Sequence, residues 1–426
     1  MTDVATTRPY GVLGRVLGHT YTPTIYKELA GLEYVRFERE PEDLEAFMTG
    51  DEWEGTNVTI PYKADAAAAA DERSPRVRRL GVANTLVRRP DGTIYAENTD
   101  VLGFAWMLER FCRRELGGSA NEVLLGKKCL VLGSGGASQA VQAALEDVGA
   151  AVVVVSRAGE DNYGNLLERH ADASLVVNTT PVGMFPSCPA TPVADEDLAR
   201  MAGLLGVLDV VYNPNRTGIC LAAESLGLPS ESGLAMLVAQ AFFASELFQG
   251  KKLDEASIEP IELDIERQTR NIVLIGMPGA GKTTTGKRLA RLLSRPFVDI
   301  DDEVALRSGQ TAAQIIEQRG EDAFRKVETE VTGDVCSRSG LVVACGGGVV
   351  TRPCNRDLLR QNGVVVMVDR PLGELSSKGR PVSAAKGIER LAAERMDAYR
   401  SWSDIQIECT GTAEGDAKVI LSKVGF

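Results

Sequence analysis

The sequence contains little of several residue types that catalytic and structural sites commonly use. Only two histidines occur, His19 and His170, so acid–base chemistry must rely mainly on Lys, Asp, Glu or Tyr. Eight cysteines are present, but no two of them form a C-x-x-C pair. Their scatter argues against a zinc site and against a disulfide framework. We therefore expect reduced thiols and a cytoplasmic protein.

Long apolar runs are also absent. The most apolar helical segment, residues 233–248, is shorter than a membrane span and contains Gln240 and Glu246. The N-terminus lacks a basic segment followed by an apolar one, so we predict no signal peptide. The formal net charge of −12 argues against general binding to nucleic acid or to anionic membranes. We expect no membrane and no nucleic acid among the partners.

The length and the composition indicate a globular protein with more than one domain. A chain of 426 residues is too long for a single core and suggests two or three domains. The composition, 44% hydrophobic and 25% charged, is ordinary for a soluble protein. Short β-forming runs alternate with helical segments along most of the chain, which predicts an α/β fold.

The clearest motif is a glycine-rich turn between a strand and a helix within residues 271–293. Gly276, Gly281, Lys282 and Thr283 satisfy the pattern G-x-x-x-x-G-K-[ST]. In such a turn the backbone N–H groups surround a polyphosphate, the lysine reaches the terminal phosphates and the hydroxyl ligates Mg²⁺. The motif predicts that this part of the chain binds a nucleoside triphosphate.

A second glycine turn lies within residues 127–157, which are patterned as strand, turn, helix and strand. Gly133, Gly135 and Gly136 permit a tight turn and a close approach of the backbone to a pyrophosphate. Ser138 stands where the third glycine of a dinucleotide fingerprint is usual. The glycine spacing alone is a weak indication, and its βαβ context favours a dinucleotide-binding site.

The end of the second strand of that unit bears on the choice of cofactor. An NAD-binding enzyme commonly offers Asp or Glu there, whereas this chain has Ser156 and Arg157. A guanidinium suits a 2′-phosphate and therefore favours NADP. The alternative is an ordinary surface arginine after a strand.

Charged residues are also expected at the ends of two further strands. Residues 55–63 are predicted to form a strand that closes with Lys63, at the edge of a sheet where ligands bind. In the strand near residues 297–301, Asp299 and Asp301 alternate and should project from the same face. The alternative is that the two acidic residues lie in a loop and are solvated.

The C-terminal part of the chain resembles a shikimate kinase. Its motifs occur in order along the chain: GMPGAGKT (276–283), FVDID (297–301), AFRKVE (323–328), CGGGVV (345–350), GRP (379–381) and ERMDAY (394–399).

The N-terminal part resembles a shikimate dehydrogenase. Its motifs are GHTYTP (18–23), NVTIPYK (57–63), VANT (82–85), ENTD (97–100), GSGGAS (133–138), NTTPVGM (178–184), VVYNP (210–214) and GLAMLVAQA (233–241). The two families act consecutively, since one makes shikimate and the other phosphorylates it. The two motif sets occupy separate parts of the chain and are independent of each other, so their agreement supports a bifunctional shikimate-pathway enzyme.

The two resemblances imply an α/β architecture with three parts. These are a shikimate-dehydrogenase-like substrate domain, a Rossmann NADP-binding domain, and a P-loop domain similar to nucleoside-monophosphate kinases. The expected boundaries are 1–103 with 233–262 for the substrate domain, 104–232 for the Rossmann domain, 263–270 for a linker and 271–426 for the kinase.

The dehydrogenase resemblance implies hydride transfer between NADPH and the C3 carbonyl of 3-dehydroshikimate. Lys63 and Asp100 match the family's catalytic pair, and a lysine beside a carboxylate can stabilise an alkoxide and pass a proton. The alternative for Lys63 is a surface ion pair. The implied substrate contacts are Thr20, Thr22, Thr59, Asn84, Tyr212 and Gln240. The implied cofactor contacts are Gly133, Ser134, Gly135, Gly136, Ala137, Ser156 and Arg157.

The kinase resemblance implies transfer of the ATP γ-phosphate to the shikimate 3-hydroxyl with Mg²⁺. Lys282 and Arg380, the latter on a loop expected to be mobile, would act on the phosphates, and Asp301 would orient and deprotonate the hydroxyl. The implied metal contacts are Thr283 and Asp299. The implied shikimate contacts are Asp301, Arg325, Gly347, Gly348 and Arg395. The implied nucleotide contacts are Gly279, Ala280, Gly281, Lys282, Thr283 and Thr284.

The sequence departs from both families at a few positions. Thr20 and Thr22 stand where serines are usual, and Val101 replaces a common glycine. The NADP signature Asn-Arg-Thr reads Ser-Arg-Ala at 156–158, and Asp161 lies near the place of a second arginine. In the kinase half, an arginine usually found ahead of the lid is replaced by Ser-Ser-Lys at 376–378.

Two alternatives stay open on the sequence. The first is an NAD-dependent quinate/shikimate dehydrogenase fused to a kinase of another small polyol acid. The second is that one half is a sensing module that binds its nucleotide without turnover. In each case we expect small-molecule partners and a monomer or homodimer.

Overall fold

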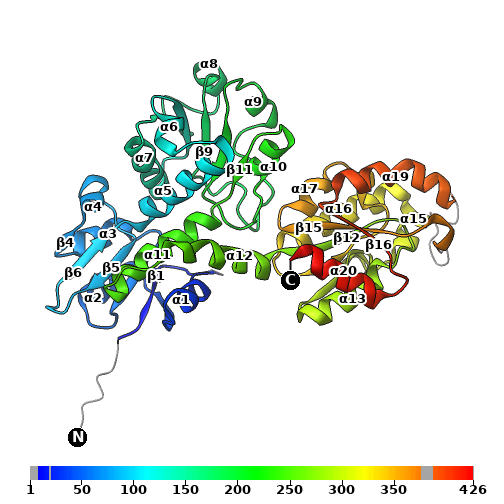
Figure 1. The fold of residues 1–426 in the computed structure, drawn as a ribbon, viewed down its shortest axis with the longest axis horizontal. Coiled ribbons are helices and arrows are strands. Elements are labelled where there is room, and N and C mark those ends of the chain that lie inside the picture. The colour runs from blue at the N-terminus through cyan, green and yellow to red at the C-terminus, as the bar shows by residue number, and fades with distance from the viewer. Residues whose placement is uncertain (1–7, 19–20, 376–386, 426) are drawn as a thin grey trace, which may run out of the picture. The chain divides into compact units, whose positions relative to one another are not determined.

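The computed structural model describes residues 8–18, 21–375 and 387–425 (Figure 1). The chain divides into two compact units. The first comprises Met1–Pro181, Pro192–Tyr212 and Ala222–Ile265, and the second comprises Val182–Thr191, Asn213–Leu221 and Glu266–Phe426.

The first unit begins with a six-stranded sheet in the order β2-β1-β3-β5-β6-β4. The strand β1 pairs in parallel with β2 and β3, and β5 and β6 form an antiparallel hairpin. The strands are β1 (Tyr10–Gly14), β2 (Tyr34–Glu38), β3 (Gly55–Val58), β4 (Glu72–Arg73), β5 (Thr85–Arg88) and β6 (Ile94–Glu97). The helices are α1 (Thr22–Ala30), α2 (Leu44–Thr49), α3 (Lys63–Ala69) and α4 (Pro75–Leu80).

A five-stranded parallel sheet follows in the order β11-β10-β9-β7-β8. Most of its strand residues are buried, because helices cover both faces of a parallel sheet. The strands are β7 (Lys128–Leu132), β8 (Ala151–Val155), β9 (Leu175–Asn178), β10 (Gly206–Asp209) and β11 (Ser230–Glu231). The helices are α6 (Ala120–Leu124), α7 (Gly136–Asp147), α8 (Leu166–His170), α9 (Asp195–Ala199) and α10 (Gly218–Ser225). This arrangement confirms the predicted Rossmann fold.

Two long helices connect these sheets and pack against each other. Helix α5 (Thr99–Phe111) leads out of the first sheet, and α11 (Leu234–Gln249) returns to it. A Cβ atom on Gly103 of α5 would lie 2.7 Å from the carbonyl oxygen of Met236 in α11. The glycine therefore sets the separation of the helices. Because α11 also carries Gln240, this contact positions a predicted site residue.

The junction with the second unit is helical. Helix α12 (Ile258–Thr269) is followed after one residue by strand β12 (Asn271–Ile275). The segment 263–270 was expected to be a linker, and all of it except Arg270 belongs to this helix. Its buried Ile258, Ile261 and Ile265 join the core formed with α1 and α11, which explains why the segment is ordered.

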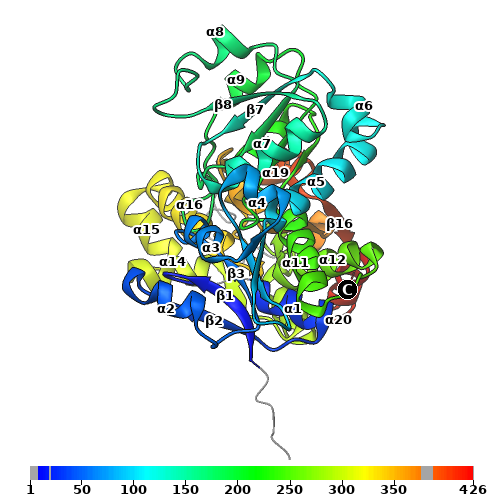
Figure 2. The same cartoon turned by 90° about the vertical axis from the view of Figure 1, so that its left-hand side faces the viewer.

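The second unit holds a five-stranded parallel sheet in the order β13-β14-β12-β15-β16. Strands β12, β15 and β16 are labelled in Figure 1, and β16 is also labelled in Figure 2. The central strand β12 is fully buried and feeds the phosphate-binding turn. The other strands are β13 (Phe297–Asp299), β14 (Val342–Ala344), β15 (Gly363–Asp369) and β16 (Ile405–Glu408). The helices are α13 (Lys282–Leu293), α14 (Ile300–Ser308), α15 (Ala312–Arg319), α16 (Glu321–Ser337), α17 (Asn355–Arg360), α19 (Ile388–Trp402) and α20 (Ala413–Val424).

Two local predictions were wrong. Strand β3 ends at Val58, and Lys63 begins helix α3 instead of closing the strand. Pro61 ends the strand pattern, and the alanine-rich tract after it favours a helix. Strand β13 ends at Asp299, which caps α14 by accepting a hydrogen bond from the N–H of Asp301 at 3.0 Å. Asp301 thus lies in the first turn of a helix, where acidic residues are favoured.

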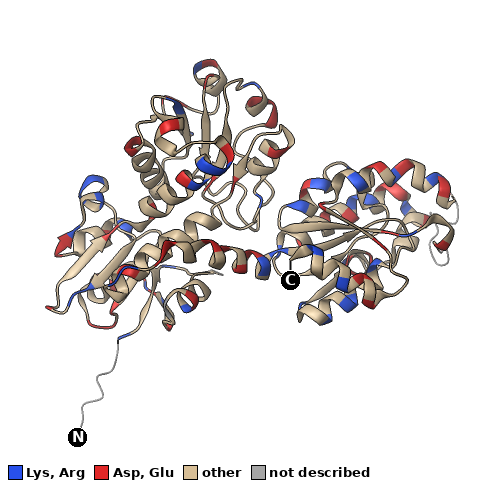
Figure 3. Ribbon diagram, viewed as in Figure 1, with Lys and Arg blue, Asp and Glu red and all other residues tan. Residues whose placement is uncertain are grey.

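Figure 3 shows acidic and basic residues interspersed along the helices of both units. Among the residues that the structure describes, no helix combines the length and the apolar character needed to cross a membrane.

We predict that Gly103→Ala destabilises the first unit by about 1–3 kcal/mol, because its methyl group overpacks the contact with α11. An alanine in an exposed helix would be stabilising, so the sign of the change is diagnostic. Hydrogen–deuterium exchange should accelerate in α5 and α11 and stay unchanged in residues 271–375. Unchanged or slower exchange in these two helices would contradict the close approach.

Candidate active sites

The first unit contains a cavity of about 360 Å³. It lies where the turns after β1 and β3 and the residue before β5 meet α5, α11 and the start of α7. The predicted residues that line it are Thr22, Thr59, Lys63, Asn84, Asp100, Ala137, Tyr212 and Gln240. Thr20 lies outside the described residues. The structure thus gathers side chains from distant parts of the sequence into one pocket.

An ion pair between Lys63 and Asp100 lies in this cavity. The ammonium of Lys63 donates to Oδ2 of Asp100 at 2.5 Å, and the two side chains are only 18% and 15% exposed. Asn84 donates from Nδ2 to the other oxygen, Oδ1, at 2.8 Å. The pair is therefore half-buried and oriented, which distinguishes it from an exposed surface ion pair. Its ammonium can donate to an oxygen atom that gains negative charge.

Residues that the sequence prediction missed extend this polar cluster. Asn84 Oδ1 accepts from the N–H of Thr99 at 2.7 Å, and the Thr99 hydroxyl contacts Gln240 Oε1 at 3.4 Å. Asn57 lines the cavity, and its amide oxygen accepts hydrogen bonds from the hydroxyls of Tyr26 (2.5 Å) and Tyr34 (2.6 Å). Asn57 belongs to the motif NVTIPYK and Thr99 to the motif ENTD. Membership of these motifs is the sequence feature that could have identified them as site residues.

The dinucleotide turn borders the same cavity. Gly133 has φ +105°, a conformation that favours glycine. A Cβ on Gly136 would lie 3.9 Å from Cδ of Lys63, and the neighbouring Ala137 lines the pocket. The Ser138 hydroxyl donates to the carbonyl of Gly133 at 2.7 Å, so this serine closes the turn. A cofactor on this turn would lie next to Lys63.

The loop after β8 presents Arg157 to solvent. Arg157 is exposed and forms no ion pair with any residue that the structure describes. Asp161, noted as a departure from the NADP signature, is engaged by His170 Nε2 at 2.8 Å and by Arg169 at 3.1 Å. Its carboxylate is therefore occupied by two other side chains, and it does not pair with Arg157.

The second unit contains a cavity of about 550 Å³. It extends over the phosphate-binding turn and the turns that follow β13 and β14. The predicted residues that line it are Gly279, Gly281, Lys282, Thr283, Thr284, Asp299, Asp301, Arg325, Gly347, Gly348 and Arg395. Ala280 is fully buried behind the turn. Arg380 lies outside the described residues.

The phosphate-binding turn has the backbone that its motif requires. Gly276, Gly279 and Gly281 have φ values of +138°, +87° and +99°, and a Cβ on Gly276 would lie 2.5 Å from the carbonyl oxygen of Val368. Lys282 is 8% exposed and donates to the carbonyls of Gly276 (2.9 Å) and Met277 (3.0 Å). These contacts hold the ammonium over the turn, where the phosphates of a nucleotide would bind.

Thr283 and Asp299 fit the requirements of a magnesium ion. The Thr283 hydroxyl donates to Oδ2 of Asp299 at 2.7 Å. Mg²⁺ prefers oxygen ligands and usually combines one or two protein oxygens with water and substrate phosphates. Within the described residues, no cluster of three or more His, Cys, Asp or Glu side chains could hold a metal ion. The hydroxyl of Thr283 and the carboxylate of Asp299 supply two oxygen donors of the kind that Mg²⁺ prefers.

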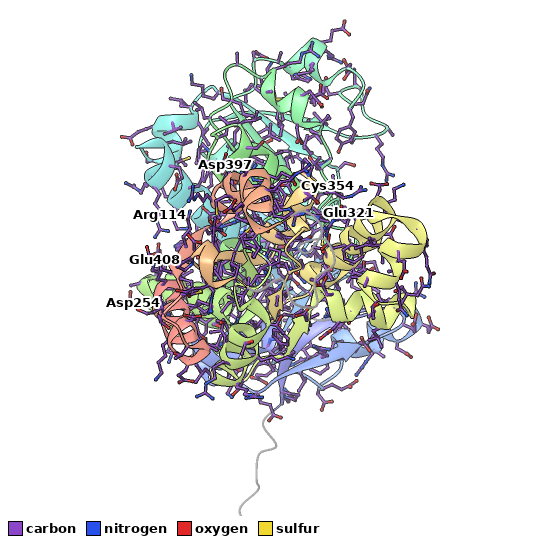
Figure 4. The ribbon with its side chains drawn as sticks, turned by 90° about the vertical axis from the view of Figure 1, so that its right-hand side faces the viewer. Arg114, Asp254, Glu321, Cys354, Asp397 and Glu408 are labelled. Atoms are coloured by element: carbon purple, nitrogen blue, oxygen red, sulfur yellow. The ribbon has the colours of Figure 1, made fainter. Side chains whose placement is uncertain are left out.

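Two arginines converge at the other end of the cavity. Arg325 is 8% exposed and donates to Glu328 at 2.7 Å and to Glu321, labelled in Figure 4, at 3.0 Å. Arg395 donates to the carbonyl of Gly347 at 2.8 Å. A Cβ on Gly348 would lie 2.0 Å from Nη2 of Arg325. Only glycine leaves room for this guanidinium.

The electrostatics of this end depend on burial. Burial raises the pKa of the Asp301 carboxyl, and the charge of Asp299 raises it further, whereas Lys282 opposes the shift. Burial also raises the pKa of Glu328, against the effect of Arg325. Asp301 is consequently a stronger base than a solvated aspartate. Glu328 was missed as a site residue, although it closes the AFRKVE motif.

Comparison with known proteins finds a different family in each part of the chain. The family model described as the shikimate dehydrogenase substrate binding domain matches residues 12–86, and the shikimate kinase model matches residues 278–424. A shikimate dehydrogenase (NADP(+)) of Clostridium perfringens (strain SM101 / Type A) is 33% identical over 275 residues, which cover 59% of this chain and 96% of that protein. The chain belongs to the shikimate dehydrogenase family. It also carries a shikimate kinase domain, so the predicted fusion is confirmed.

Solved structures show the same relationship for the dehydrogenase part. A chorismate mutase/shikimate 5-dehydrogenase fusion protein from Clostridium acetobutylicum is 32% identical with a TM-score of 0.55, covering 61% of this chain and 97% of that one. Shikimate 5-dehydrogenase from Thermus thermophilus, solved with NADP(H) and shikimate, is 28% identical with a TM-score of 0.51, covering 61% of this chain and 99% of that one.

Proposed function

We propose that this bifunctional enzyme reduces 3-dehydroshikimate with NADPH and phosphorylates the resulting shikimate with ATP and Mg²⁺. The observation that supports it is the pairing of two unlike cavities on one chain. One holds the Lys63–Asp100 pair beside a dinucleotide turn. The other holds Lys282 over a phosphate-binding turn and Arg325 at its far end.

In the dehydrogenase cavity the protein binds the ketone and manages one proton. The nicotinamide, when bound, supplies the hydride. Lys63 would donate a hydrogen bond to the C3 oxygen and then a proton as that oxygen becomes an alcohol. Asp100 holds the ammonium in place, and Asn84 orients Asp100. The remaining hydroxyl and amide groups of Thr22, Thr59, Tyr212 and Gln240 would select the ring hydroxyls and the carboxylate.

In the kinase cavity the chemistry is mainly positioning and charge neutralisation. ATP supplies the phosphoryl group, and Thr283 and Asp299 would hold its Mg²⁺. Asp301 would take the proton of the attacking hydroxyl, a role that its raised pKa favours. The planar guanidinium groups of Arg325 and Arg395 suit the carboxylate of shikimate. We retain Arg380 as a phosphate contact on the sequence resemblance alone.

The choice of cofactor and the setting of the enzyme are also proposals. The exposed and unpaired Arg157 supports NADP over NAD, and steady-state assays with both cofactors and with quinate would separate the rival dehydrogenase. The presence of Lys63, Asp100, Lys282 and Asp301 in formed cavities argues against a non-catalytic sensing half. All eight cysteines are free thiols, which supports a cytoplasmic location. We expect a monomer or a homodimer.

We predict that Lys63→Ala lowers the rate of NADPH-dependent reduction by about 10²–10⁴-fold and leaves phosphorylation near normal, because one proton donor is removed from one cavity. Lys282→Ala should have the converse effect. A coupled assay that supplies 3-dehydroshikimate, NADPH and ATP with Mg²⁺ measures both steps, and wild type should yield shikimate 3-phosphate. Failure of wild type to form that product would refute the proposed function.

We further predict that Gly348→Ala lowers kcat/KM for shikimate phosphorylation by at least about 10²-fold, since the new methyl group displaces the Arg325 guanidinium. Gly333→Ala is the matched control. Gly333 lies within α16, where a Cβ would meet Leu358 at an ordinary 3.6 Å. Equal kinetics for the two variants would show that Arg325 does not need its observed position.

A further inference from the structure

Arg370 lies beside the phosphate-binding turn and is not among the residues assigned to phosphoryl transfer. It directly follows Asp369, the last residue of β15, which pairs with the strand that feeds the turn. A Cβ placed on Gly281 would lie 3.6 Å from Nη2 of Arg370. The guanidinium therefore reaches the turn from the side of β15.

The positive charge of Arg370 is not neutralised by the protein. It forms no ion pair with any carboxylate of the described residues, and its buried Nε has no hydrogen-bond partner among them. Cys409 is its polar neighbour; burial raises the pKa of this thiol, and the hydrogen bond with Arg370 lowers it. The nearby Asp416 is occupied by Thr410 and Thr285. An unpaired guanidinium next to a phosphate-binding turn suits an anion.

The strand order shows which end of a nucleotide would meet Arg370. The turn follows the central strand β12 in the order β13-β14-β12-β15-β16. Asp301 and Gly348 follow β13 and β14, at the end of the cavity that is proposed to bind shikimate. Arg370 and Cys409 follow β15 and β16, on the other side of the turn. The γ-phosphate must lie next to shikimate, the acceptor of the phosphoryl group. The nucleoside end of the nucleotide must therefore extend in the opposite direction, toward β15. The phosphate nearest that end is the α-phosphate.

We propose that Arg370 binds the α-phosphate of the nucleotide in the kinase cavity. The inference rests on the proposed kinase function. A guanidinium–phosphate contact is a charge-assisted hydrogen bond, and Arg can form it with two parallel N–H groups where Lys cannot. Arg370 would thus set nucleotide affinity and have no contact with shikimate, which binds on the other side of the turn.

The test compares Arg370→Met with wild type in the full chain, using MgADP as the probe in isothermal titration calorimetry. The dissociation constant of MgADP should rise about 10- to 100-fold, the effect of losing one charge-assisted contact. Its dependence on ionic strength should also become shallower, because one positive charge no longer contributes. The KM for shikimate should stay within about twofold of wild type, as expected for a group that does not touch it. Arg370→Lys should recover part of the loss.

Arg291→Met is the matched control, since Arg291 is an exposed arginine in the last turn of α13. Its MgADP affinity should equal that of wild type. Equal affinity for MgADP in Arg370→Met and wild type would overturn the inference while leaving the kinase function intact. A parallel loss of shikimate binding and of thermal midpoint would also overturn it, because it would indicate a structural role. Failure of wild type to bind MgADP would instead refute the proposed kinase function.

Discussion

Both sites depend on close approaches that only glycine permits. Gly103 lets α5 and α11 touch and so places Gln240 at the first cavity. Gly348 leaves space for the guanidinium of Arg325, and Gly276 lets the phosphate-binding turn pass the carbonyl of Val368. At each of these positions a methyl group would meet an atom at less than 3.0 Å. The energetic consequence is that the polar groups of the sites are held by backbone geometry before any ligand binds.

Ion pairs hold a cationic side chain in each cavity, where it can contact a negatively charged group of the substrate. Lys63 is paired with Asp100, and Arg325 is paired with Glu328, both with little exposure to water. Each pair satisfies the hydrogen-bonding needs of a charge that would be costly to bury alone. A substrate then meets preorganised donors and does not have to order flexible side chains. Arg370 differs from these cations because its charge has no carboxylate partner among the described residues.

The sequence was sufficient to predict the fold and about half of the residues that line the two cavities, because the motifs fix both strand–turn–helix geometry and order along the chain. The sequence-based predictions were wrong at two sites where a strand pattern and a helix start compete for the same residues. Asp301 was placed on a strand by alternation, yet the carboxylate of Asp299 caps helix α14 there. Lys63 was placed at the end of a strand, yet it begins helix α3 after Pro61. Asn57, Thr99 and Glu328 were missed since their roles arise from contacts between distant segments, and the position of Arg370 beside Gly281 required the pairing of β12 with β15.

The proposed function requires two separate substrate-binding pockets within one polypeptide. The most direct measurement is a crystal structure of the full chain grown with NADP⁺, shikimate and MgADP. The account predicts electron density for shikimate at Lys63 and Asp100 and, in the same chain, for a second shikimate at Arg325 and Arg395. Shikimate density at neither place, or at only one of them under saturating ligand, would contradict it.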